Sequence, residues 1–227
     1  MGEGERLQFA VEGAGDVSAI LMRPPKAGWL LVLAHGAGAG MTHSFLEKLA
    51  SELADAGVAS FRYQFPYMEQ RRRVPDRPSV ATATVAGAVR AAANAAGDLP
   101  MLAGGKSFGA RMTSQAASQQ LLEGVRGLVF FGFPLHPPNK PGTKRAEHLD
   151  KVQIPMLFLQ GTRDTLADLK LLRPICAELS KRATLHITET ADHSFHVLKS
   201  SGRTDADVLR ELAQTTAGWA ENLEIKA

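Results

Sequence analysis

Short apolar runs alternate with longer segments of helical periodicity along this chain of 227 residues. Eight of the short runs have the length and apolar content of β-strands, and they cover residues 7–11, 17–22, 29–34, 58–63, 101–104, 127–131, 156–160 and 184–187. The first two alternate apolar and polar residues, which predicts an antiparallel edge hairpin that turns around Gly13 and Gly15. The later runs are almost continuously apolar, as in strands that are covered on both faces.

The segments between the strands carry the 3.6-residue period of helices. They predict helices over 44–56, 80–96, 166–179 and 204–223, and a further helix after Ser107 that turns Met112, Ala116 and Leu121 toward the sheet. Ser44, with Glu47 three residues later, matches a capping box, and Thr204 is expected to cap the last helix. This alternation predicts an α/β fold in which a mostly parallel eight-stranded sheet is covered by helices on both faces.

The composition predicts a single globular domain over residues 1–227. Hydrophobic residues make up 44% of the chain and charged residues 22%, and no repeat, low-complexity segment or linker interrupts it. Two long stretches without periodicity, 64–78 and 133–153, are rich in proline and charge, and long loops of this kind are more often functional than idle. The second is too short for a multi-helix lid, so we expect no cap domain and an open site roofed by residues 133–153 and 64–73.

Charge and cysteine content narrow the function classes. A formal net charge of +3 and a pI near 9.1 are too mild to imply a nucleic-acid partner, and the one basic cluster, 71–73, is followed by prolines that predict a solvated loop. The single cysteine, Cys176, excludes an intrachain disulfide and a cysteine-based zinc site, and its helical spacing places it in the core. With neither a secretion signal nor an apolar run of about 20 residues, we expect a cytoplasmic protein without membrane contact.

A serine near the middle of the chain has the surroundings of a nucleophile. Residues 105–109, Gly-Lys-Ser-Phe-Gly, fit the pattern G-x-S-x-G, follow the predicted strand 101–104 and open a predicted helix. The sharp strand-to-helix turn of this pattern strains the serine backbone, and it needs small residues two positions before and after so that strand and helix can approach closely. We therefore predict that Ser107 is a nucleophile. The alternative is a glycine-rich strand end with an incidental serine.

A serine hydroxyl needs a neighbouring base, which an acid in turn orients. Asp164 follows the predicted strand 156–160, His193 follows the predicted strand 184–187, and their order after the serine is the one that accompanies G-x-S-x-G. The rival acids are Asp168, one helical turn further on, and Asp192, whose adjacency to the histidine usually points its carboxylate away. The rival base is His196. We favour Asp164 as the acid and His193 as the base.

The same chemistry needs hydrogen-bond donors for a developing oxyanion. The N–H of Phe108 is one candidate, because this residue follows the serine. The second is expected in the loop 35–40, His-Gly-Ala-Gly-Ala-Gly, whose small residues let backbone amides turn inward, and Ala37 is the first choice. This loop lacks the spacing of a phosphate-binding P-loop or a dinucleotide site. We expect His35 to hold the loop by hydrogen bonds rather than to act as a base.

With these motifs, the chain resembles an α/β-hydrolase over nearly its whole length. Five segments resemble a small capless subgroup related to dienelactone hydrolases: HGAG at 35–38, RYQFPY at 62–67, GKSFGAR at 105–111, FPLHPP at 133–138 and QGTRD at 160–164. The resemblance implies a triad of Ser107, Asp164 and His193. Two departures are Ala110, where the subgroup often has glycine, and Ser107 itself, because dienelactone hydrolases usually carry a cysteine there.

Several cations flank the predicted site. Lys106 precedes the serine, Arg163 precedes the acid, and Arg62 and Arg111 are expected near the same sheet edge. Some of them could bind a substrate carboxylate, which arginine can hold in bidentate fashion, or they could form structural ion pairs. His136 could line the pocket or fix its own loop by a hydrogen bond.

These residues predict a hydrolase that cleaves a small-molecule carboxylic ester through an acyl-enzyme, with no need for a metal or an organic cofactor. Thioesterase, lactonase and peptidase reactions would use the same groups. The alternative function is a non-catalytic interaction module on a hydrolase scaffold, because some eukaryotic relatives in the resembled subgroup are subunits of chromatin complexes. The oligomeric state is left open by the sequence.

Overall fold

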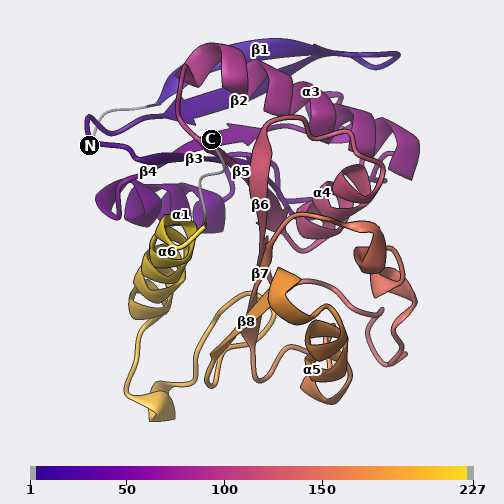
Figure 1. Cartoon of the computed structure of the whole chain (residues 1–227), viewed down its shortest axis with the longest axis vertical. Helices are drawn as coiled ribbons and strands as arrows, with labels where there is room; N and C mark the ends of the chain where they lie inside the picture. The colour runs from indigo at the N-terminus through magenta and orange to yellow at the C-terminus, as the bar shows by residue number, and fades with distance from the viewer. Residues whose placement is uncertain (1–3, 224–227) are drawn as a thin grey trace.

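One eight-stranded sheet runs through the computed structural model, which describes residues 4–223 (Figure 1). Its strands are β1 (Glu5–Val11), β2 (Gly15–Met22), β3 (Trp29–Ala34), β4 (Val58–Tyr63), β5 (Met101–Lys106), β6 (Val125–Phe131), β7 (Met156–Gly161) and β8 (Ala183–Thr188). They lie in the order β1-β2-β4-β3-β5-β6-β7-β8, and only the pairings β1–β2 and β2–β4 are antiparallel. All eight predicted strands and the edge hairpin are confirmed.

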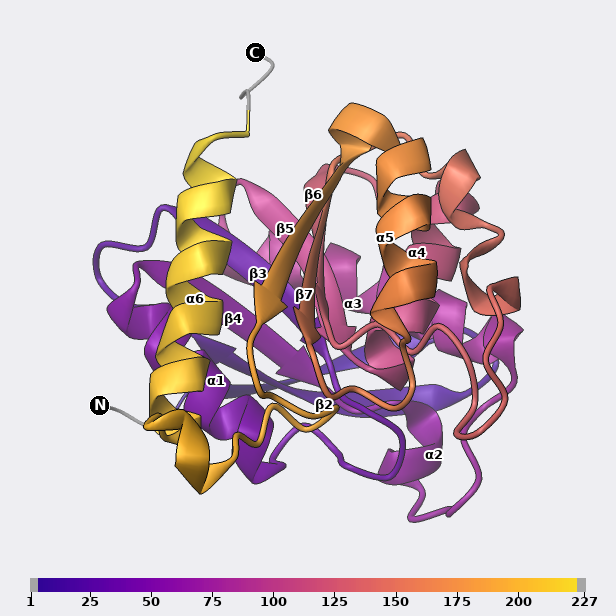
Figure 2. The same cartoon turned by 90° about the horizontal axis from the view of Figure 1, so that it is seen from below.

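Helices cover both faces of this sheet (Figure 2). They are α1 (Ser44–Asp55), α2 (Pro66–Glu69), α3 (Pro78–Ala96), α4 (Phe108–Ser118), α5 (Leu169–Glu178) and α6 (Asp205–Glu221). In the view of Figure 2, α1 and α6 lie on one side of the strands and α3, α4 and α5 on the other. The predicted fold class is confirmed, and Thr204 caps α6 in a capping box as expected.

Three helix details differ from the sequence prediction. The N-cap of α1 is His43, whose Nδ1 accepts the N–H of Phe45, so Ser44 is already inside the helix. Helix α5 begins at Leu169 rather than three residues earlier, because the Asp168 side chain accepts the N–H of Lys170 and caps the helix there. Leu121 lies beyond the end of α4 and is 41% exposed, so it does not face the sheet.

The two long loops contain short elements that periodicity did not predict. Residues 64–78 include the four-residue helix α2, and residues 133–153 include the 3₁₀ turns η1 (Lys144–Ala146) and η2 (Leu149–Lys151). Leu149 and Val152 are buried in the core on the α4 side, where His148 Nε2 lies 2.8 Å from Ser114 Oγ. Much of this second loop therefore packs against α4. The sequence predicted only that the loop would cover the site, and did not predict this packing role. No cap domain is present among residues 4–223.

The core consists of two apolar layers, one on each face of the sheet. Along β3, Leu30 and Val32 belong to the layer under α3, α4 and α5, whereas Leu31 and Leu33 belong to the layer under α1 and α6. This alternation follows from the two-residue period of a strand and explains the continuous apolar runs of the sequence. Cys176 is buried in the first layer, and burial raises the pKa of its thiol to about 11, as expected for core packing rather than nucleophilic chemistry.

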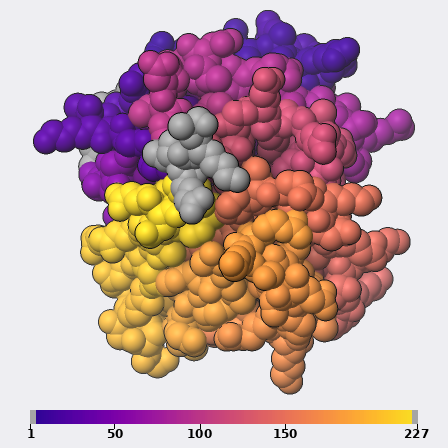
Figure 3. All heavy atoms as spheres, in the orientation of Figure 1, coloured from indigo at the N-terminus to yellow at the C-terminus, as the bar shows by residue number. Residues whose placement is uncertain are grey.

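The strand order also fixes where a site can form. From β3 the chain moves to β4 on one side and later to β5 on the other, so the order reverses between β3 and β5. Such a reversal leaves a crevice beyond the carboxyl ends of the strands. In the space-filling view, the colours run from indigo at the top to orange and yellow at the bottom, as this order of strands requires (Figure 3).

The turn from β5 into α4 depends on the glycine at position 109. A Cβ at Gly109 would lie 2.6 Å from the carbonyl oxygen of Ala34 and 2.7 Å from that of His35, both of which are backbone atoms. A Cβ at Gly218 in α6 would meet nothing within 4 Å.

We therefore expect Gly109→Ala to lower the free energy of unfolding by about 1–3 kcal/mol despite the better helix propensity of alanine. The control Gly218→Ala should be neutral or stabilise by up to about 1 kcal/mol. Denaturant unfolding of both variants measures the difference, and equal stabilities would contradict the close-approach argument.

Candidate active site

Ser107 occupies a strained turn between β5 and α4. Its φ of 52° and ψ of −108° lie in the left-handed half of the backbone map, which non-glycine residues seldom adopt. Hydrogen bonds fix the turn on both sides, because the Ser107 N–H donates to the carbonyl of Phe131 (3.2 Å) and the Ser107 carbonyl accepts from the N–H of Arg111 (3.1 Å). The side chain is thereby held at the carboxyl edge of the sheet, as expected for a nucleophile elbow.

The structure brings Ser107, His193 and Asp164 into one hydrogen-bonded chain. His193 Nε2 lies 2.8 Å from Ser107 Oγ, and His193 Nδ1 lies 2.7 Å from Asp164 Oδ2. The Asp164 side chain is fully buried and that of His193 is 21% exposed. With Nδ1–H donated to the carboxylate, Nε2 is free to accept the serine proton, which is the tautomer that proton transfer requires.

Two further donors hold the Asp164 carboxylate. The backbone N–H of Leu166 donates to Oδ1 at 2.7 Å, and the side-chain amide of Gln160 donates to Oδ2, the oxygen that also faces His193. Gln160 is fully buried at the end of β7. These bonds compensate the loss of water around a buried carboxylate and fix its orientation. Gln160 lies within the segment QGTRD, but nothing in its type or position in the sequence indicated this role.

The rival residues are engaged elsewhere. Asp168 caps α5, and Asp192 Oδ1 accepts the backbone N–H groups of Ser194 and His196 at 2.8 and 3.0 Å. His196 Nδ1 pairs with Asp205 at 2.8 Å on the surface, where its side chain is 64% exposed. Of the candidate acids and bases, Asp164 and His193 are therefore the two that are linked to Ser107.

In the loop after β3, two amides are bound and that of Ala37 is without a partner on the described protein. The N–H of Gly38 donates to Tyr67 Oη at 2.9 Å and that of Ala39 donates to the carbonyl of Gly36 at 3.2 Å. Within residues 4–223, the N–H of Ala37 has no acceptor. The N–H of Phe108 stands in the first turn of α4, where helical amides have no intrahelical partner. Both amides that the sequence suggested for an oxyanion are thus available as donors.

His35 holds this loop instead of acting as a base. Its Nδ1–H donates to the carbonyl of Gly36 at 2.7 Å, and its Nε2 accepts the N–H of Phe65 at 3.1 Å. Burial lowers the pKa of the imidazole to about 4, so it is neutral near pH 7. The structural role expected for His35 is the one observed.

Tyr67 is a second support of the loop and was not assigned a role from the sequence. The side chain is fully buried, with its ring centroid 6.0 Å from His35 and 6.4 Å from Phe108, and its hydroxyl accepts the N–H of Gly38. Helix α2 places it there, and the backbone N–H of Tyr67 donates to Asp76 Oδ2 at 2.9 Å. The only feature of the sequence that pointed to Tyr67 was its place in the segment RYQFPY, and that segment indicated a family resemblance but no chemical role.

Most of the candidate substrate-binding residues have partners within the protein. Lys106 Nζ donates to the carbonyl of His193 at 2.6 Å, and the exposed Arg163 donates to the carbonyl of Thr190 at 3.0 Å. Buried His136 uses both ring nitrogens, since Nδ1–H donates to the carbonyl of Pro137 and Nε2 accepts the N–H of Asp168. Of its two interpretations, loop fixation is the observed one.

Among the remaining cations, Arg62 has a partner within the protein, whereas Arg111 and Arg145 have no carboxylate partner in residues 4–223. Arg62 is buried and donates to the carbonyl of Met41 at 3.1 Å. Arg111 and Arg145 lie near each other and partly buried, and within the described part of the chain neither guanidinium has a carboxylate within 4 Å. Burial lowers the pKa of Arg111, and the neighbouring charge of Arg145 lowers it further.

Residues 4–223 contain neither a cluster of metal ligands nor a helix that could span a membrane. No three histidine, cysteine, aspartate or glutamate side chains in this range are grouped as metal ligands would be. No helix in the same range combines the length and apolar character that crossing a bilayer requires.

Comparison with known proteins agrees with this architecture. The chain is similar to a lidless α/β serine hydrolase from Xanthomonas campestris, with 18% identity, coverage of 100% of this chain and 98% of that one, and a TM-score of 0.74. It is also similar to dienelactone hydrolase from Anabaena variabilis, with 19% identity, coverage of 98% and 99%, and a TM-score of 0.74. The family model described as "Alpha/beta hydrolase domain" matches residues 27–221. The chain therefore belongs to the α/β-hydrolase family, as the sequence motifs had suggested.

Proposed function

We propose that this protein is a serine hydrolase that cleaves carboxylic esters through an acyl-enzyme intermediate. One observation carries the proposal: Ser107 Oγ, the His193 ring and the Asp164 carboxylate form a continuous relay with distances of 2.8 and 2.7 Å. A relay of this kind turns a hydroxyl into a nucleophile at neutral pH. The strained turn at Ser107 and the free amides beside it support the same conclusion.

In the acylation step, His193 Nε2 accepts the proton of Ser107 as Oγ attacks the ester carbonyl. The bond that forms joins Oγ to the carbonyl carbon, and the carbonyl oxygen becomes an oxyanion between the N–H groups of Ala37 and Phe108. One such donor is commonly worth about 10²–10³ in kcat. The protonated imidazole then gives its proton to the departing alkoxide, and Asp164 stabilises the imidazolium through Nδ1–H.

In the deacylation step, water replaces the alcohol. His193 takes a proton from the water, whose oxygen attacks the acyl carbon, and the same two amides hold the second oxyanion. Collapse of this intermediate breaks the bond to Ser107 Oγ, which regains its proton from the imidazole and releases the carboxylic acid. Each proton that leaves one group is received by another, so the cycle needs no external acid or base.

The absence of a cap domain over residues 4–223 bears on substrate size. A tunnel for a long acyl chain requires a covering structure, and the loop 133–153 supplies mainly packing against α4. We therefore propose that the substrates are small esters or esters presented on a larger surface. A thioester or lactone with a small acyl group would fit the same description.

The first test is labelling of the purified full-length chain with a fluorophosphonate probe. Wild type should label, because phosphonylation needs the same activated hydroxyl, and Ser107→Ala should not. A folded wild type that stays unlabelled would contradict the proposal and favour a non-catalytic interaction module. A panel of p-nitrophenyl esters of short and long acids then measures the acyl preference.

The loop after β3, residues 35–40, gives a second prediction. In Tyr67→Phe the N–H of Gly38 loses its acceptor on the protein, so the neighbouring Ala37 amide should lose its alignment and kcat should fall about tenfold with little change in KM. Tyr63→Phe is the matched control, since the buried Tyr63 hydroxyl has no hydrogen-bond partner among the described residues. Equal kcat values for the two variants would show that Tyr67 does not support the loop.

A third prediction concerns Arg111, which has no carboxylate partner among the described residues. If a substrate carboxylate is bound near the site, Arg111 is a cation left free to hold it, whereas Lys106 and Arg163 are engaged. Arg111→Met should then lower kcat/KM about tenfold for a carboxylate-bearing ester and leave its neutral analogue unchanged. An unchanged ratio of the two substrates in the variant would reject carboxylate recognition by Arg111.

A further inference from the structure

The Lys106 side chain links the nucleophile to the segment that carries the base. It leaves the last residue of β5, directly before Ser107, and its Nζ donates to the backbone carbonyl of His193 at 2.6 Å. The two groups are 87 residues apart in the sequence, so the bond joins the end of β5 to the loop after β8. It joins the same two segments as the contact between Ser107 Oγ and His193 Nε2, but through the backbone of the histidine.

The ammonium group is held from several sides. Its Nζ lies 5.9 Å from the ring centroid of Phe45 and 5.6 Å from that of Phe195, and these two rings are themselves stacked 5.9 Å apart. A cation at this distance from an aromatic face is attracted by the ring quadrupole. On another side, a Cβ at Gly132 would lie 3.1 Å from Nζ, so glycine at this position leaves room for the ammonium. The geometry favours one position of the amine.

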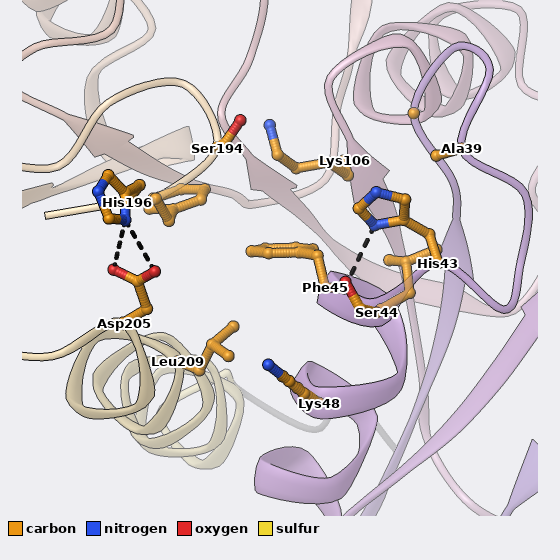
Figure 4. Close-up of a pocket in the computed structure, with 13 residues that line it drawn as sticks. Ala39, His43, Ser44, Phe45, Lys48, Lys106, Ser194, His196, Asp205 and Leu209 are labelled. Carbon is orange, nitrogen blue, oxygen red and sulfur yellow. Dashed lines mark hydrogen bonds and ion pairs between the residues drawn. The ribbon is translucent and has the colours of Figure 1, made fainter.

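A cavity of about 270 Å³ lies beside Lys106, between the first turns of α1 and α6 and the segment after His193 (Figure 4). The figure shows the Lys106 side chain directed toward the segment that carries Ser194, away from Lys48 on the opposite wall. The amine is bound by the His193 carbonyl and feels the charges of Asp164 and Asp192. The other charged and titratable groups of the cavity wall are His43, Lys48, His196 and Asp205. Neither Ser107 nor His193 lines this cavity, so Lys106 lies between it and the relay.

We propose that Lys106 is a positioning residue, whose ammonium fixes the His193 segment so that the imidazole stays between Ser107 and Asp164. The inference rests on the proposed hydrolase function for its catalytic consequence, but the mechanical link stands on the contacts alone. The donor is a charged ammonium group, and a charge-assisted hydrogen bond of this kind is roughly twice as strong as one between neutral groups. This assigns Lys106 to the histidine and not to a substrate carboxylate.

The charge of this donor is sensitive to pH. Burial lowers the pKa of Lys106 to about 8, against the opposing attraction of Asp164 and Asp192. The ammonium therefore predominates below about pH 8, and above it the neutral amine is a weaker donor to the His193 carbonyl. Positioning, and with it kcat, should decline as the pH rises through this range.

The first experiment compares Lys106→Met with Lys48→Met in the full-length protein. Lys106→Met should lower kcat about 10- to 100-fold with little change in KM and should increase hydrogen–deuterium exchange in residues 189–198. Lys48→Met removes a lysine of the same cavity that does not contact His193, and it should leave both quantities unchanged. Thermal unfolding of each variant confirms that the fold is retained.

The second experiment follows the pH profile. Lys106→Cys, alkylated with 2-bromoethylamine, restores an amine of nearly the same length but lower basicity, so activity should return with its alkaline limb shifted to lower pH. The one native thiol, Cys176, is buried, and alkylated wild type is the control for its modification. If Lys106→Met does not fold, this alkylated variant and Lys106→Arg still decide the proposal, because Lys106→Arg should extend activity to higher pH.

Three results would overturn the proposal. They are an unchanged kcat in folded Lys106→Met, unchanged exchange in residues 189–198, or a defect confined to the KM of carboxylate-bearing esters, which would instead make Lys106 a substrate-binding residue. If wild type neither labels nor cleaves esters, the proposed function fails. The exchange measurement still decides the positioning role in that case, because it does not depend on turnover.

Discussion

The close approach of β5 and α4 to the end of β3 is the constraint on which the site depends. Gly109 lies so near the backbone of Ala34 and His35 that no Cβ fits, and the chain between Gly105 and Gly109 must turn within a few residues. That turn forces Ser107 to a positive φ. The strain is sustained by the packed sheet around it, and it holds the hydroxyl at the strand ends.

Burial then determines which polar groups can surround the serine. A buried carboxylate or imidazole is costly unless hydrogen bonds replace its water. Asp164 receives bonds from Gln160, from the amide of Leu166 and from His193, and His35 uses one nitrogen on Gly36 after β3 and the other on Phe65 after β4. These bonds leave each ring in a single tautomer. The geometry of the relay is thus a consequence of satisfying buried groups.

Supporting residues escaped the sequence analysis for a common reason. Tyr67 and Gln160 act through partners whose positions depend on the arrangement of several elements, and neither residue type is diagnostic of a role. Lys106 was noticed for its charge next to the serine, but its partner is a backbone carbonyl 87 residues away. A backbone acceptor leaves no mark in the sequence, so only the folded chain identifies the contact.

The sequence by itself determined the fold class, all eight strands and the residues of the relay, because burial on two faces gives continuous apolar runs and the nucleophile turn demands small residues at fixed spacing. It misplaced local details such as the start of α5 and the environment of Leu121, where a cap or the end of a helix overrides periodicity. The tertiary structure decided which cations are free and which are engaged. It did so because long side chains can reach many partners, and their choice depends on distances between strands that lie far apart in the chain.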